Sequence, residues 1–241
     1  MSLRALGFAL LCLLAATNGW AAVAFDAATS SDCASCTSLS WSHTTSTGSD
    51  RLLTVGTQIS GAGRTLTSVT YNSVSLSTKC SEVNTNGNEY RPYISELVAP
   101  ATGSNTVAIT VSGSALDLIG GAVTWTGAHQ TTPTGTCASA TGTSTTPSVA
   151  PTVASDEIAI DSLIIASYNA PTVGSGQTQR WNRTPFFVAR GAGSTEPGPN
   201  PTMSWTGDNV DWAITAVGVK PASGAAPAGP AGRINLMGVG K

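Results

Sequence analysis

Short apolar or alternating runs, separated by Gly, Asn, Ser, Thr and Pro, fill the chain from Val23 to Lys220. Such runs are typical of antiparallel β-strands, in which successive side chains point to opposite faces. No stretch after the first 22 residues shows sustained helical periodicity. The pattern predicts an all-β fold with strands over residues 51–59, 67–71, 90–98, 106–112, 115–125, 157–167, 178–182, 202–205 and 211–219.

The length of 241 residues fits one β-sandwich domain. Two runs, residues 116–125 and 158–166, carry almost no charge, so we expect them to be central strands covered on both sides. A segment rich in Thr, Ser, Pro and Ala, residues 131–153, is interpreted as a threonine-rich edge strand whose prolines discourage further pairing. We therefore expect a single antiparallel two-sheet β-sandwich, jelly-roll-like, over residues 23–221.

The N-terminus has the features of a secretory signal peptide. Arg4 precedes an apolar run, residues 5–16, that includes Cys12 and is too short to span a bilayer. Small residues then precede cleavage points after Ala21 or Ala24. Residues 1–22 are predicted to be removed on export, leaving no membrane span, and the mature protein is expected to be secreted, either extracellular or at the cell surface.

Four cysteines remain outside the signal peptide: Cys33, Cys36, Cys80 and Cys137. An even number in an exported chain predicts two disulfides, for which three connectivities exist. Cys33–Cys36 with Cys80–Cys137 is the simplest, and the rival pairings tie the N-terminal segment to one or both distant cysteines. The loop-like surroundings of the Cys33–Cys36 pair disfavour a redox motif, and no second close Cys or His pair completes a zinc site.

The charged residues and the histidines indicate which ligands and partners the chain could bind. The formal net charge of −2 provides no positive field for nucleic acid. Asp208 and Asp211 could supply oxygen ligands to Ca²⁺, although a turn before the last strand explains the same residues and is the favoured interpretation. No other cofactor is predicted. His43 and His129 lack metal-type spacing and are expected to be solvated or hydrogen-bonded.

One group of aromatic residues could bind carbohydrate. Trp181 stands among polar residues and follows Arg180, while Tyr90 and Tyr93 flank another arginine. Sugar rings present an apolar face that stacks on aromatic rings. The alternative is that Trp181 closes one end of the core beneath an arginine.

Several short segments typical of strands and turns occur at residues 68–76, 96–105, 120–127, 176–181 and 212–221, among them Gly-Gly-Ala-Val-Thr-Trp-Thr-Gly and Gly-Gln-Thr-Gln-Arg-Trp. Through these segments, residues 50–221 resemble a poorly characterised β-sandwich module of bacterial secreted and cell-surface proteins. The resemblance implies the fold and the setting and transfers no catalytic residue.

The C-terminus changes composition after Pro221. Ala, Gly and Pro form a spacer as far as Gly232, and a short apolar tail follows that contains Ile234, Leu236, Met237 and Val239. Residues 222–241 are thus interpreted as spacer and tail. A tail of this kind could add as a strand to a neighbouring subunit, or it could be a frayed terminus.

Three functions are compatible with these features. The first is a non-enzymatic extracellular structural or assembly protein, a surface or filament subunit that self-associates through its tail. The second is a carbohydrate-binding or adhesive module that binds surface glycans through Trp181. The third is a glycan-directed hydrolase using acids in apolar strands such as Asp161 and Asp117, or Glu96, with no pairing evident from the sequence.

Overall fold

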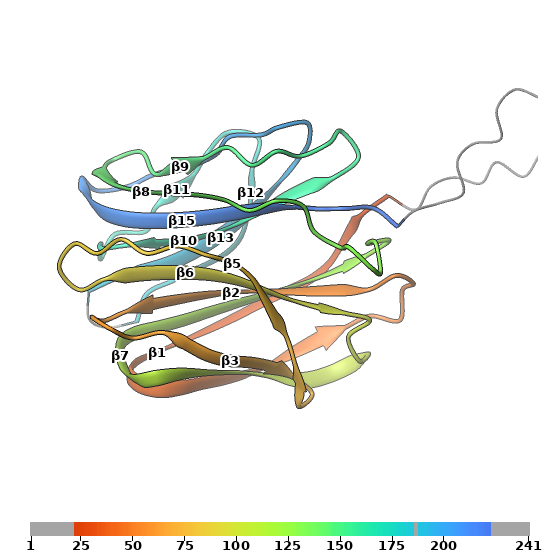
Figure 1. Ribbon diagram of the computed structural model, residues 1–241, viewed down its shortest axis with the longest axis horizontal. Coiled ribbons are helices and arrows are strands. Elements are labelled where there is room, and N and C mark those ends of the chain that lie inside the picture. Colours follow the sequence, from red (N-terminus) through yellow and green to blue (C-terminus); the bar gives the residue numbers. More distant parts are fainter. Residues whose placement is uncertain (1–21, 186–187, 223–241) are drawn as a thin grey trace, which may run out of the picture.

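The computed structural model describes residues 22–185 and 188–222, and these form strands and turns without a helix. The all-β prediction is confirmed. The strands form three antiparallel sheets rather than two (Figure 1). The N-terminal sheet contains β1 (Ala24–Thr45), β2 (Leu52–Ser60), β3 (Leu66–Tyr71), β4 (Val74–Ser75), β5 (Ser77–Ser81), β6 (Tyr90–Val98) and β7 (Gly103–Thr126).

The C-terminal sheet has the strand order β12-β13-β10-β15-β8. Its members are β8 (Ala138–Ser144), β10 (Ile158–Ile165), β12 (Thr178–Arg183), β13 (Arg190–Pro197) and β15 (Val210–Val219). A small third sheet joins β9 (Ser148–Val149), β11 (Thr172–Val173) and β14 (Met203–Thr206).

The N-terminal sheet folds over on itself because its two longest strands bend together. The first part of β7 pairs with β3, the second part pairs with β2, and β1 follows β7 through both parts. Leu39 of β1 and Ile109 of β7 consequently pack in the same apolar core as Val55 of β2. This first core lies between the two halves of the folded sheet.

A second core lies between the N-terminal and C-terminal sheets. Leu52 and Trp125 from the first sheet pack with Ile160 and Val217 from the second. A third core lies on the other side of the C-terminal sheet, where Leu163 of β10 packs in a cluster with Met203 and Trp205 of the small sheet. The successive cores explain why strands in the middle are covered on both faces.

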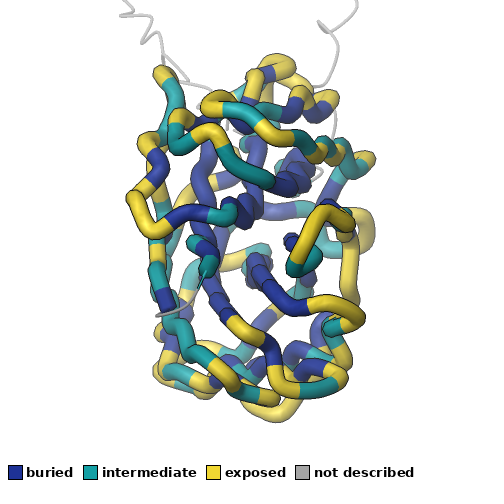
Figure 2. The backbone as a smooth tube through the Cα atoms, turned by 90° about the vertical axis from the view of Figure 1, so that its left-hand side faces the viewer, coloured by how far each residue is buried: buried dark blue, intermediate teal, exposed yellow. Residues whose placement is uncertain are grey.

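Burial along these strands confirms the expectation drawn from the two uncharged runs. All nine residues of β2 are buried, as are residues 117–125 of β7 and 159–165 of β10. In Figure 2 the buried segments run through the middle of the molecule, and exposed segments gather at its ends and sides. Among residues 22–185 and 188–222, there is no helix of the length and apolar character needed to cross a membrane.

Candidate functional site

Trp181, the residue predicted to stack on a sugar, lies in the second core with only 3% of its surface exposed. Three glycines on three strands leave room for its indole: Gly56 on β2, Gly121 on β7 and Gly193 on β13. A Cβ atom at Gly121 or Gly193 would lie within 2.2 Å of the ring. The indole therefore has no exposed face for a sugar, which corrects the carbohydrate-binding assignment of this residue.

The other residues of the predicted sugar site are also engaged elsewhere. Tyr90 and Tyr93 are buried and belong to different apolar clusters. Arg180 stacks its guanidinium 3.8 Å from the centroid of the Phe25 ring and donates a 2.9 Å hydrogen bond from Nε to Thr195 Oγ1. The four side chains thus do not come together in a common site.

Asp208 and Asp211, the predicted calcium ligands, accept hydrogen bonds from different neighbours. The carboxylate of Asp208 accepts from Ser167 and Asn169. The carboxylate of Asp211 accepts from Thr143 and Asn86. Residues 22–185 and 188–222 contain no group of three or more His, Cys, Asp or Glu side chains that could hold a metal ion. The arrangement gives the calcium hypothesis no shared set of ligands.

The acids considered for hydrolysis hold neighbouring segments in place. Asp161 is fully buried and accepts hydrogen bonds from Trp205 Nε1 at 2.7 Å and from the backbone N–H and hydroxyl of Ser194. Burial raises the pKa of Asp161 to about 7. Asp117, also buried, accepts from Ser60 and from the backbone N–H groups of residues 188 and 189. These carboxylates connect strands and loops.

The histidines are hydrogen-bonded, as expected. His43 is buried, with Nδ1 2.8 Å from Thr29 Oγ1 and Nε2 3.3 Å from Thr124 Oγ1. Burial lowers its pKa to about 4. His129 Nδ1 accepts from the backbone N–H groups of Thr131 and Thr132.

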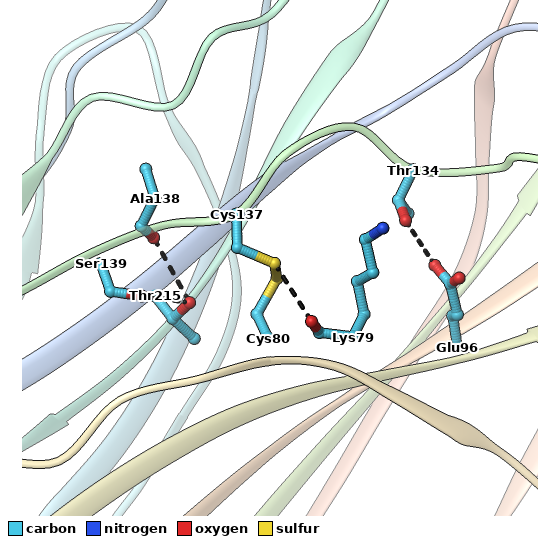
Figure 3. The surroundings of a disulfide bond; sticks show 8 residues. All are labelled: Lys79, Cys80, Glu96, Thr134, Cys137, Ala138, Ser139 and Thr215. Carbon is cyan, nitrogen blue, oxygen red and sulfur yellow. Dashed lines mark hydrogen bonds between the residues drawn. A yellow bond between two sulfur atoms is a disulfide. The ribbon is translucent and has the colours of Figure 1, made fainter.

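Both disulfides have the simplest of the predicted pairings, Cys33–Cys36 and Cys80–Cys137. The second joins β5, at one edge of the N-terminal sheet, to the residue immediately before β8, at one edge of the C-terminal sheet (Figure 3). Thr134 strengthens the same margin by donating a 2.6 Å hydrogen bond to Glu96 of β6. The margin between the two sheets is thus held by a covalent bond and a charge-assisted hydrogen bond.

Strand β8 leads away from this margin and is the terminal strand of the C-terminal sheet. All seven of its residues pair with β15 without a register shift. Ser139, Thr141 and Thr143 are exposed on one face, and Ala138, Ala140 and Gly142 are partly buried on the other. The prediction of a threonine-rich edge strand is confirmed, with the difference that the prolines of this segment flank the strand and do not interrupt it.

The described chain ends close to the start of β8. Val219 bridges to Thr134, and Pro221 bridges to Ala128. The N–H of Lys220 donates to the carbonyl of Pro133, and that of Ala222 donates to the carbonyl of Gly127. The chain thus leaves the described fold from a point fixed by hydrogen bonds. Residues Ile234, Leu236, Met237 and Val239 of the predicted assembly strand lie outside the described residues.

The outer face of the folded N-terminal sheet is covered by small hydroxyl side chains. Cross-strand pairing places them on one face of β1, β7, β3 and β4, opposite the buried Leu39 and Ile109. Ten of the eleven outward positions are Ser or Thr and none is charged: Ser38, Ser40, Ser42, Thr44, Ser68, Thr70, Ser75, Ser104, Thr106, Ala108 and Thr110. Composition suggested a Ser- and Thr-rich chain, but only the strand register gathers these residues on a single surface.

No model of a known protein family matches the chain, and no curated protein or solved structure resembles it closely enough to count as a match.

Proposed function

We propose that this chain is a non-enzymatic extracellular structural protein that self-associates through its C-terminal tail. In this proposal residues 1–22 are a signal peptide, and residues 23–221 are a jelly-roll-like two-sheet sandwich to which the small sheet is an addition. Residues 222–241 are the assembly segment.

The main support for this proposal is that hydrogen bonds fix the point at which the chain leaves the fold. The hydrogen bonds of Lys220 and Ala222 hold this point against residues 127–133. The residues of the three cores lie between Val23 and Val219. A spacer rich in Ala, Gly and Pro then separates this point from the apolar residues 234–239. A tethered apolar segment that the cores do not require is suited to bind a neighbouring copy.

The disulfides support an extracellular setting. Two disulfides in one domain are typical of proteins that fold in an oxidising compartment. Both involve strands at the periphery of the sheets, where local opening begins most easily. In a subunit exposed to the cell exterior, disulfides at these strands would oppose local opening.

Light scattering on the mature chain, residues 23–241, tests the proposal. We expect oligomers that dissociate in the double variant Ile234→Asp/Leu236→Asp, because two charges cannot be buried without partners. The matched control is Ala225→Asp/Ala228→Asp, which adds the same charge to the spacer and should leave the oligomers intact. A wild-type monomer at all concentrations, or loss of assembly in both double variants alike, would contradict a role of the apolar tail.

A second candidate function, adhesion to an uncharged surface, is favoured by the hydroxyl-rich face of β1, β7, β3 and β4. Soluble proteins usually carry interspersed charges over their surfaces, and this face has none among its eleven outward positions. Binding to insoluble polysaccharide, measured by sedimentation, should be lost in Thr106→Lys and retained in Thr178→Lys on β12. Equal binding by both variants would exclude this face.

A further inference from the structure

The edge strands of the described sheets differ in how they discourage pairing with another chain. Natural edge strands carry charges, prolines or bulges, or are very short, because an open row of N–H and C=O groups recruits other strands. On β12, Arg180 and Arg183 supply charge and a bulge interrupts the register at residues 179–181. On β5, Lys79 lies within a bulge. β4 has only two residues.

Strand β1 is protected along most of its length. It carries Asp26 and Asp32, and two bulges shift its register against β7. Arg183 of β12 reaches across to Ser30, where it donates a 2.7 Å hydrogen bond to the carbonyl oxygen. Its last eight residues, 38–45, are uncharged and in register, so this part of β1 serves as a comparison in the experiment below.

Strand β8 has none of these protections. Its seven residues include no charge and no proline, and its pairing with β15 contains no bulge. It also lies at the place where the chain leaves the fold, because Thr134, shortly before β8, bridges to Val219. The absence of charge, proline and bulge along the whole strand distinguishes β8 from β1, β5 and β12, and its length distinguishes it from the two-residue strands β4, β9 and β11.

We propose that the outer edge of β8 is the acceptor for residues 233–241 of a second copy, which add to the C-terminal sheet as a sixth strand. This inference rests on the proposed function and names the surface that the tail would bind. Strand addition supplies main-chain hydrogen bonds, and alternate side chains supply specificity.

The side chains of the two strands are complementary. Ala138, Ala140 and Gly142 are small, and a Cβ at Gly142 would lie 2.8 Å from the ring of Trp212. The Trp212 ring therefore covers Gly142, and an apolar residue on an adjacent strand would lie beside this ring. Ile234 and Leu236 are two residues apart and share one face of an extended segment. Placed on this face, they would extend the third core.

The length of the spacer favours a second copy over the same molecule as the source of the tail. A tail running directly from Ala222 along its own β8 would be parallel to it, which is the less stable arrangement. Antiparallel pairing would require the spacer to run past β8, a distance of about 23 Å for seven residues. Ten spacer residues reach about 31 Å when extended, which leaves little chain to reverse direction. The tail of another copy can enter antiparallel without this constraint.

Disulfide cross-linking between full-length mature chains tests the assignment. One chain carries Thr141→Cys on β8, the other carries Met237→Cys, and the linked peptides are identified by mass spectrometry after mixing under oxidising conditions. Matched acceptors carry Thr178→Cys on β12 or Ser42→Cys on β1, which are equally exposed positions on other edge strands. We expect at least tenfold more linkage of position 237 to position 141 than to either control.

The self-association of lysine variants on two edge strands provides a second measurement. Thr141→Lys adds an edge charge at an exposed side chain and should weaken self-association at least tenfold, while Thr178→Lys should leave it unchanged. If the chain self-associates through its tail but position 141 shows no preference, the β8 assignment fails and the proposed function survives. If the chain with both Thr141→Cys and Met237→Cys forms only an internal link, the second-copy assignment fails. A monomeric wild type would overturn the proposed function first.

Discussion

At the scale of single residues, Trp181 packs against three glycines in the second core. Any side chain at Gly121 would meet the indole, because a Cβ there would lie 2.2 Å from Cδ2. We expect Gly121→Ala to lower the free energy of unfolding by about 1–3 kcal/mol through overpacking. Gly135→Ala is the control, since its nearest atoms would lie at 3.8 Å. Urea denaturation of both variants tests this expectation, and equal midpoints would contradict it.

The sequence around Trp181 could not reveal this contact. Its neighbours Gln179, Arg180 and Asn182 are polar, a context that resembles an exposed binding residue. The residues that bury it, Gly56 and Gly121, lie far away along the chain and are brought together only by the packing of the two sheets. Local composition therefore indicates how polar a segment is, but not which of its side chains the opposing sheet covers.

Two buried titratable groups make the stability depend on pH in opposite directions. Burial lowers the pKa of His43 to about 4, so its contribution is present above pH 6.5 and is lost as the pH falls toward 4. Burial raises the pKa of Asp161 to about 7, so its contribution is present below pH 4 and is lost as the pH rises toward 7. Between pH 4 and 6.5 the two effects oppose each other.

Removing one of these groups should expose the effect of the other. As the pH is lowered from 6.5 to 4.5, the free energy of unfolding of His43→Gln should rise relative to wild type by about 1 kcal/mol per pH unit. Chemical denaturation at several pH values measures this difference. A difference that stays constant with pH would mean that His43 titrates normally in the folded protein.

At the scale of elements, the two disulfides close loops of very different length. Cys80 and Cys137 are separated by 57 residues, and Cys33 and Cys36 by 3. Loop-closure entropy predicts that replacing both cysteines of the long loop by Ala costs about 4 kcal/mol, against about 2 kcal/mol for the short loop. Thermal or urea denaturation of the two double variants provides the comparison. Equal losses would show that the Cys80–Cys137 bond does not constrain the unfolded chain as this model requires.

The elements that the sequence predicts well are those with apolar alternation or uncharged runs. β2, β6, β10 and β15 fall within a few residues of their predicted ranges. β1 is missed, because its 22 residues are mostly small and polar. Two predicted strands merge into β7, since Gly113 and Ser114, which separate the apolar runs, continue the strand at its bend. Strand propensity cannot show that a Ser-rich segment will pair along the whole length of a neighbour.

At the scale of the whole molecule, the cores are connected through shared strands. β2 contributes Val55 to the first core and Leu52 to the second, and β10 contributes Ile160 to the second and Leu163 to the third. Opening any one core therefore exposes one face of a strand whose other face is packed in a neighbouring core. One domain over residues 23–221 stays a prediction, and the sequence could not show that the strands would form successive layers.

We therefore expect residues 23–241 to unfold in a single cooperative transition. Far-UV circular dichroism follows all strands, while tryptophan fluorescence reports on all three cores, through Trp41 in the first, Trp125 and Trp181 in the second, and Trp205 and Trp212 in the third. The two signals should give the same urea midpoint. Val55→Ala in the first core and Leu163→Ala in the third should each lower that midpoint in both signals, because removing buried methyl groups destabilises the unit that contains them. If Leu163→Ala split the transitions into two steps and shifted only one of them, the C-terminal sheet would be unfolding separately and the described strands would form two domains.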